Sequence, residues 1–157
     1  MGGGRNLRTS TVVTLETLPA WARDLLAEAR VARLGYVDEG DHPRVLPVTF
    51  AVAGGAVWSA IDDKPKRSAE PARLRHLRRR PHAALLVDRY DEDWTRLGWV
   101  LLHGRAEILA DGVEHDAAQV LLRARYPQLA QMRIAHRAVI VIRITRSVSW
   151  GDLSIKA

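Results

Sequence analysis

Cysteine is absent from the 157 residues of the chain. Disulfides, thiol nucleophiles, iron–sulfur clusters and cysteine-based zinc sites are therefore excluded. Long apolar runs are also missing: none approaches the roughly 20 residues that a membrane-spanning helix needs. The N-terminal stretch lacks the charged-then-apolar pattern of a secretory signal. From these absences we expect a cytoplasmic protein.

Sequence motifs of common catalytic machinery are missing as well. The chain has no Gly-x-Ser-x-Gly elbow, no phosphate-binding Gly-x4-Gly-Lys loop and no Gly-x-Gly-x-x-Gly pattern. Its six histidines never stand four residues apart on a predicted helix, so no metal site is expected. Three carboxylates meet at Asp91-Glu92-Asp93, which we interpret as a solvated turn. Nothing in the sequence indicates hydrolysis, acyl transfer or phosphoryl transfer.

Positive charge is in excess. The formal net charge is +6, and only three of the 24 basic residues are lysines. Such a balance favours an anionic partner: a nucleic acid, an anionic lipid surface, or a phosphorylated or carboxylated small molecule. With 47% hydrophobic and 27% charged residues, the composition is that of a globular protein.

The chain is predicted to fold as one domain over residues 18–157, after a flexible, glycine-rich tail at 1–17. A helix is expected to begin at Thr17-Leu18-Pro19, with Thr17 as its N-cap. Further helices are predicted at 71–80 and 112–126. Alternating and β-branched segments predict six strands, at 31–37, 44–53, 56–61, 83–88, 99–109 and 138–145. This pattern indicates a mainly β fold with flanking helices (α+β), built on a small six-stranded antiparallel barrel.

Two segments have features beyond those of a scaffold. Pro47 lies inside a predicted strand, and because proline cannot donate to a ladder it implies an edge, a bulge or an interrupted pairing. Backbone freed there could face a ligand; the alternative is an ordinary edge strand. The segment from Trp58 to Lys66 carries the Ser59 hydroxyl and two lysines, groups suited to a phosphate. Its alternative is a solvated basic loop.

The predicted helix at 71–80 is rich in arginine. Its N-terminus would offer free amides and the positive end of a helix dipole, both of which favour an anion. The alternative is a soluble basic face.

Taken in order, these segments carry a family resemblance. Pro47-Val-Thr-Phe50, the Lys64-Pro-Lys66 loop, the arginine helix ending at Pro81 and the strand Leu86-Val-Asp88 resemble the pyridoxamine-phosphate-oxidase-like split barrels. Within that group the chain is most similar to the actinobacterial branch that uses the deazaflavin coenzyme F420. Asp88 to Arg96 and Ser147-Val-Ser-Trp150 fit this branch. The resemblance covers about residues 18–152.

The resemblance implies a split barrel of the kind that binds flavin mononucleotide (FMN), and a homodimer with two cofactor sites at the subunit interface. The residues that it places at the cofactor fall into three groups. Along the ring system it implies Pro47, Val48, Thr49 and Phe50. Near the phosphate it implies Trp58, Ser59, Ala60, Ile61, Lys64, Lys66 and Arg73. From the partner chain it implies Trp94 and Arg96.

The sequence departs from the family pattern in two places. His76 stands where an asparagine is common, and extra residues separate Lys64 from Arg73. The cation that would hold the phosphate is therefore left open among Lys64, Lys66 and Arg73. No catalytic residue is assigned.

An oxidoreductase that transfers hydride between the reduced deazaflavin and a small conjugated acceptor is the leading hypothesis. Such a protein binds, orients and shields its cofactor and needs no nucleophile, which fits the missing motifs. The alternatives are an FMN-dependent oxidoreductase of the same fold and a non-enzymatic protein that stores or senses the cofactor. Nucleic-acid binding through the arginine helix is disfavoured, because no aromatic residues interleave with the arginines.

Overall fold

The structure is a computed structural model, which describes residues 10–12, 15–61 and 70–154. The described strands form one antiparallel sheet, with bounds β1 Ser10–Val12, β2 Ala32–Val37, β3 Pro43–Val48, β4 Ala51–Ala53, β5 Ala56–Ala60, β6 His82–Arg89, β7 Gly98–Leu109 and β8 Val139–Gly151. The helices are α1 Ala20–Glu28, α2 Ala72–Arg79, α3 Val113–Arg125 and α4 Pro127–Ala130, with 3-10 turns η1 Leu15–Thr17 and η2 Trp94–Arg96.

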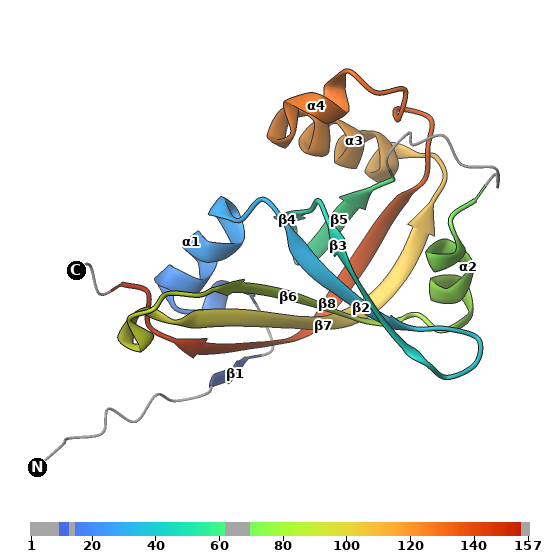
Figure 1. Ribbon diagram of the computed structural model, residues 1–157. Helices are drawn as coiled ribbons and strands as arrows, with labels where there is room; N and C mark the ends of the chain where they lie inside the picture. The colour runs from blue at the N-terminus through green and yellow to red at the C-terminus, as the bar shows by residue number, and fades with distance from the viewer. Residues whose placement is uncertain (1–9, 13–14, 62–69, 155–157) are drawn as a thin grey trace, which may run out of the picture.

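The strand order closes the sheet almost completely. Along the sheet the order is β3-β2-β6-β7-β8-β5-β4, so β3 and β4 form its two ends. These end strands are nevertheless consecutive in the chain, joined only by Thr49 and Phe50. The chain therefore crosses from one edge of the curled sheet to the other within two residues. Figure 1 shows the resulting split barrel, which confirms the predicted fold class.

The strand count differs from the predicted six. The segment predicted as one strand over 44–53 is two strands with different partners, since β3 pairs with β2 and β4 pairs with β5. β-Propensity is continuous across Thr49 and Phe50 and says nothing about pairing partners, so the break was missed. The eighth strand, β1, lies in the segment that was expected to be a flexible tail.

Within the segment predicted as a tail, the structure describes the strand β1 and the 3-10 turn η1. β1 pairs with the second half of β8, Ser10 opposite Ser149 and Val12 opposite Ser147, because β8 extends beyond the predicted 138–145 and offers a free edge there. Thr17 is also not a helix N-cap. It ends the 3-10 turn η1, and α1 starts after Pro19.

Two apolar clusters flank the sheet, and β8 contributes to both. Ile140 and Ile142 point into the barrel, where α1 and α2 close its ends, while Val139 and Val141 face α3 and α4. This is the period-two alternation of a strand that is buried on both faces. Each such side chain contributes about 1.5–3 kcal/mol on burial, so the β-branched run at the end of the chain holds barrel and helices together.

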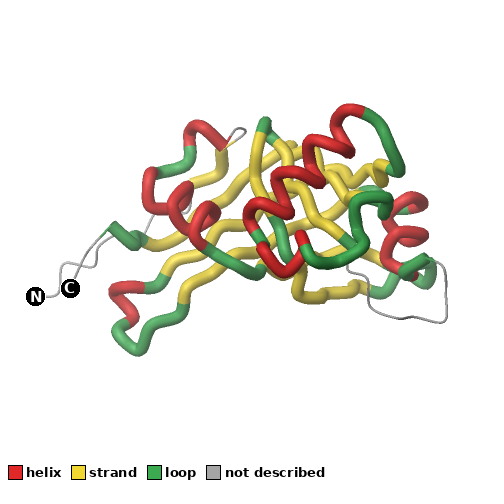
Figure 2. Tube along the Cα trace, turned by 90° about the horizontal axis from the view of Figure 1, so that it is seen from above, coloured by secondary structure: helices red, strands yellow, loops and turns green. Residues whose placement is uncertain are grey.

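The helices lie along the outside of the curled sheet and at its ends. Figures 1 and 2 show α1 near one end of the long strands and α2 near the other, with α3 and α4 beside β5. No described helix combines the length and the apolar composition that crossing a bilayer requires. The space between these helices and the sheet edges is where the cavities of the molecule lie.

Candidate functional site

A cavity of about 380 Å³ opens where the chain crosses between the two sheet edges. Five of the residues predicted from the sequence line it, namely Pro47, Val48, Thr49, Ala60 and Arg73. The remaining lining residues are Val31, Tyr126, Gln128, Leu129 and Met132. The cavity thus combines the end of β3, the end of β5, helix α2 and the short helix α4. Its volume is within the range of small-molecule pockets.

Tyr126, directly after α3, fixes the backbone at the strand break. Its hydroxyl accepts the amide N–H of Phe50 at 3.1 Å. The same hydroxyl lies 2.8 Å from the carbonyl of Phe50 and 3.1 Å from that of Arg30, to either of which it donates. A break in the ladder leaves backbone groups that must find other partners when buried. The phenol supplies these partners, so the crossing has one defined shape.

Two arginines, Arg30 and Arg125, lie beside Tyr126 and connect it to the C-terminal end of α1. The guanidinium of Arg30 stacks 4.5 Å from the centre of the Tyr126 ring and donates to the carbonyl of Arg125. Arg125 donates to the carbonyls of Ala27 and Ala29, at the C-terminal end of α1. A cation at that end also interacts favourably with the helix dipole. The end of α3 and the end of α1 are thereby tied to the strand break.

Arg73 is the one predicted cation that the structure describes at the cavity. It lies in the first turn of α2 and is half-buried. Its buried Nε has no hydrogen-bond partner among the described residues. A buried donor without a partner costs about 1–3 kcal/mol. The guanidinium also places one positive charge at the wall of the cavity, which favours an anionic group there. The predicted Lys64 and Lys66 lie outside the described residues.

The other arginines of the α2 helix and its end are engaged with carboxylates. The ion pairs are Arg75 and Arg79 with Glu39, Arg78 with Glu70, and Arg80 with Asp41. His76, the departure from the family pattern, lies on the same helix with its ring centre 6.0 Å from that of Tyr36. The basic face that the sequence suggested is therefore partly neutralised by Glu39 and Asp41 of the β2–β3 turn and by Glu70 just before α2.

The remaining predicted residues between the end of β3 and the end of β5 are buried in the two cores. The Phe50 side chain is fully buried inside the barrel, and Ile61 joins the same cluster. Trp58 packs under α3, where its indole N–H donates to the carbonyl of Ala53 at 3.1 Å. Ser59 donates its hydroxyl to the carbonyl of Thr49 at 2.8 Å. This hydrogen bond ties β5 to the segment that crosses between the two sheet edges.

Trp94 and Arg96 lie in η2, in the turn between β6 and β7, and neither lines the strand-break cavity of the same chain. Trp94 is 71% exposed. Arg96 pairs with Asp91 at 3.4 Å, and the Asp93 carboxylate accepts the backbone N–H of Thr95. The hydrogen bonds from Thr95 hold the pKa of Asp93 below its usual range. Asp91 and Asp93 thus hold the shape of the turn.

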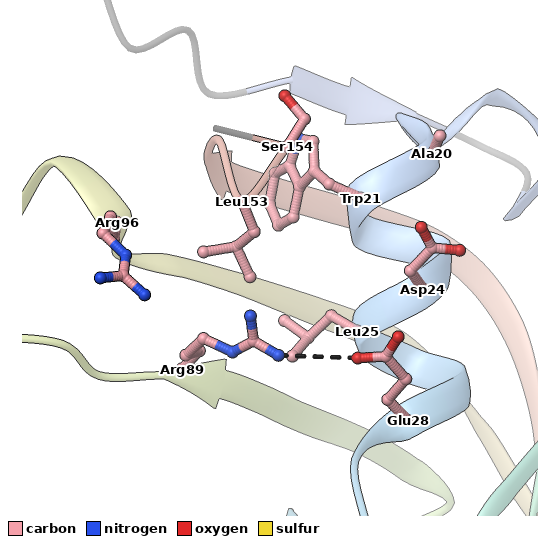
Figure 3. Close-up of a pocket in the computed structure, with 9 residues that line it drawn as sticks. All are labelled: Ala20, Trp21, Asp24, Leu25, Glu28, Arg89, Arg96, Leu153 and Ser154. Atoms are coloured by element: carbon pink, nitrogen blue, oxygen red, sulfur yellow. Dashed lines mark ion pairs between the residues drawn. The ribbon is translucent and has the colours of Figure 1, made fainter. Parts of the chain in front are cut away.

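Arg96 lines a second cavity, of about 470 Å³, at this end of the molecule. Figure 3 shows Arg89 reaching toward α1, where it lies 3.6 Å from Glu28, while Arg96 lies apart on the turn between β6 and β7. Trp21 and Leu153 form an apolar wall beside them. This cavity combines charges of both signs, whereas the strand-break cavity has one charged side chain, Arg73, among apolar and neutral polar residues.

The strand-break cavity can bind a flat apolar ring system and one anionic group. Val31, Val48, Leu129 and Met132 supply apolar walls, and Arg73 supplies the charge. Among the described residues no cluster of histidine and carboxylate side chains could hold a metal ion. Sequence analysis missed Tyr126 and the α4 residues of the wall. The one sequence signal near these residues is that the helix predicted over 112–126 ends before Pro127.

The sheet order and the crossing between its two edges define the class of split-barrel proteins. Comparison with protein families places the chain within it: the sequence profile described as pyridoxamine 5'-phosphate oxidase matches residues 18–151. The chain belongs to this family, and the resemblance noted from the sequence is confirmed. No curated protein matches the sequence significantly.

Solved structures with the same fold bind chemically different groups. A heme-binding protein from Mycobacterium smegmatis is 22% identical, with a TM-score of 0.64. The match covers 83% of this chain and 53% of the heme-binding protein. An FAD-binding protein from Mesorhizobium loti is 19% identical, with a TM-score of 0.62 and coverage of 92% and 99%. A protein titled F420 reductase is 22% identical, with a TM-score of 0.59 and coverage of 83% and 98%. At these identities the likeness shows the fold alone.

Proposed function

We propose that the chain is an oxidoreductase that binds the deazaflavin coenzyme F420 at the strand break and transfers hydride between the reduced cofactor and a small conjugated acceptor. The observation that carries the proposal is the convergence of Pro47, Val48, Thr49, Ala60 and Arg73 on one cavity. The family membership and the F420 reductase among the structural neighbours support it.

The residues present fit such a cofactor. Aliphatic and thioether side chains suit the faces of a planar ring system. The unpartnered Nε of Arg73 provides a donor for an anionic group. The excess of arginine over lysine, at a net charge of +6, also favours the polyglutamate tail of F420 over the shorter FMN.

The cofactor supplies the chemistry, because a reduced deazaflavin donates hydride and no protein side chain can do so. The chain contributes binding and orientation. Pro47 to Thr49 would form the wall along the ring system, and Arg73 would hold the anionic group. Tyr126 would fix the wall through its hydrogen bonds to Phe50. Positioning of this kind can lower a barrier by several kcal/mol without a catalytic side chain.

We also propose that the working unit is a homodimer. Tyr90 and Trp94 expose 64% and 71% of their surface on the β6–β7 turn, an arrangement typical of residues that contact a partner. In a dimer, Trp94 and Arg96 of one chain would complete the cavity of the other. Light scattering of the purified protein tests this, with a dimer mass expected for the parent chain and a monomer mass for Trp94→Asp.

The FMN-dependent alternative and the non-enzymatic alternative share this cavity. The FAD-binding and heme-binding structural neighbours are the reason to test both alternatives beside the F420-dependent function. Nucleic-acid binding is less well supported, because Arg75, Arg78 and Arg79 already pair with carboxylates.

Two measurements on the apo protein distinguish these functions. Ligand fluorescence is followed during titration with F420 and, separately, with FMN. The proposal predicts micromolar or tighter binding of F420 and at least tenfold weaker binding of FMN; the reverse order would make the protein FMN-dependent. Absorbance of reduced F420 is then followed with a panel of enones and quinones. Binding without oxidation of the cofactor by any acceptor would favour the storage function.

A further inference from the structure

A second cavity near the strand break, which we call the helix groove, lies between α1 and α3. Its volume is about 700 Å³. The short edge strand β4 contacts both helices and lies between them (Figure 1). Apolar side chains from three sides line the groove, among them Leu15, Leu26, Val52 and Leu121. The groove is therefore large enough for a small molecule and largely apolar in its walls.

Three arginines share this groove, Arg23, Arg30 and Arg125. Arg23 donates to the backbone carbonyl of Glu16 at 2.9 Å, and Arg30 donates to the carbonyl of Arg125. No described carboxylate lies within ion-pairing distance of these three guanidinium groups, although Arg44 and Arg143 elsewhere pair with carboxylates at 2.7–2.8 Å. The groove thus concentrates positive charge that no acidic side chain described in the structure balances.

The groove is separate from the strand-break cavity. The two lie on opposite sides of the crossing: Arg30, Ala51 and Arg125 line the groove, whereas Val31, Thr49 and Tyr126 line the cavity. Arg30, which lines the groove, stacks on the ring of Tyr126, which lines the cavity. A molecule in the groove is therefore not the proposed cofactor, and this inference does not depend on the proposed function.

We propose that the helix groove binds an anionic amphiphile, a carboxylate with an unbranched apolar tail. The carboxylate balances the charges of Arg23 and Arg30, whose guanidinium groups each keep donors without a partner among the described residues. The tail covers Val52 and Leu121, which are only partly buried in the free protein. Charge and apolar surface together select this class over a neutral lipid or a compact inorganic anion.

Calorimetric titration of the full chain with decanoate, compared with decan-1-ol, tests the proposal. We expect saturable binding of decanoate at one site per chain and at least tenfold weaker binding of the alcohol, which has the same tail without the charge. Equal affinities would contradict the role of the arginines. Absence of saturable decanoate binding would overturn the proposal as a whole.

Variants assign the binding to the groove. Arg23→Gln removes a charge on the exposed face of α1 and is expected to weaken decanoate binding about fivefold or more. Ala124→Trp, on an exposed lining position of α3, is expected to fill the groove and abolish binding. The matched control is Arg105→Gln, an exposed arginine on β7 that lies 3.4 Å from His82 and outside every cavity described.

Arg73→Gln separates this site from the strand-break cavity and should leave decanoate binding unchanged. Circular dichroism confirms that each variant folds. Unchanged binding in Arg23→Gln and Ala124→Trp, or an equal loss in Arg105→Gln, would refute the assignment.

Discussion

At the scale of single residues, Asp38 shows how one carboxylate shapes the turn that faces α2. Its side chain is buried and accepts the backbone N–H groups of His42 and Gly40 and the side chain of Arg44. The hydrogen bond from His42, helped by Arg44 and Gly40 and opposed by burial, holds the pKa of Asp38 well below its usual range. The charged form is therefore the one that the fold stabilises.

The direction of this shift predicts a pH dependence of stability. A carboxylate with a lowered pKa contributes its full stabilisation of the fold above its unfolded pKa of about 3.9. This stabilisation is lost as pH falls from there through the folded pKa. Asp38→Asn should lower the urea midpoint at pH 7, and the difference from the parent should shrink between about pH 4 and pH 2. The control Asp24→Asn, on an exposed position of α1, should show little effect at either pH. A difference that stays constant with pH would contradict the assignment.

The raised pKa of His115 predicts the opposite dependence of stability on pH. Burial alone would lower its pKa, but the carbonyl of Arg137 and the carboxylate of Asp116 outweigh burial and raise it. The stabilisation is present below the unfolded pKa of about 6.5 and is lost as pH rises through the folded value. His115→Gln should therefore remove a stability increment that is larger at pH 5.5 than at pH 8.5, measured by urea unfolding. A larger loss at pH 8.5 would contradict this.

At the scale of elements, the strand break between β3 and β4 decides where the cavity lies. The Tyr126 hydroxyl satisfies the backbone groups of Phe50 that leave the ladder there. Tyr126→Phe keeps the ring and removes these bonds, so we expect a loss of about 1–3 kcal/mol in the free energy of unfolding. Faster hydrogen exchange at the Phe50 amide should accompany it.

Tyr36→Phe is the matched control, since Tyr36 is equally buried and its hydroxyl has no hydrogen-bond partner among the described residues. An equal loss of stability in both variants would show that the phenol of Tyr126 does not fix the break.

Sequence reasoning located the elements better than their connections. β-Branched runs and helical periods predicted α2, α3 and the strands from β5 to β8 to within a few residues, except the far end of β8. Pro47 correctly indicated an edge strand, because β3 pairs with β2 alone among the described strands. The split at Thr49 and the strand β1 depend on long-range pairing, which local propensity does not encode. α4 was missed because Pro127 both ends α3 and occupies the first position of the next helix.

The candidate site was predictable in its strand residues and not in its helical wall. Pro47 drew attention because a proline inside a strand is a visible anomaly, and the family resemblance implied Val48 and Thr49 beside it; all three line the strand-break cavity. Trp58 and Phe50 lie in the two cores, as large aromatic side chains commonly do. Tyr126 reaches the site from 76 residues away in the chain, and only the folded arrangement of α3 against the sheet shows that contact.

At the scale of the whole molecule, the split barrel leaves cavities where the curled sheet fails to close, and the helices decide their chemistry. The strand-break cavity has α2 and α4 as walls and the Nε of Arg73 as an unpartnered donor. The helix groove has α1 and α3 as walls and three unbalanced arginines. The fold thus supplies the site, and the side chains from the helices select what binds in it.

Fluorescence titration of F420 into the parent chain, Arg73→Gln and Arg105→Gln tests the central claim most directly. The account predicts micromolar or tighter binding to the parent, about tenfold weaker binding to Arg73→Gln and unchanged binding to Arg105→Gln, with circular dichroism used to check that each variant folds. Equal affinity of the parent and Arg73→Gln, or no binding of F420 to the parent, would contradict the assignment of the strand-break cavity as the cofactor site.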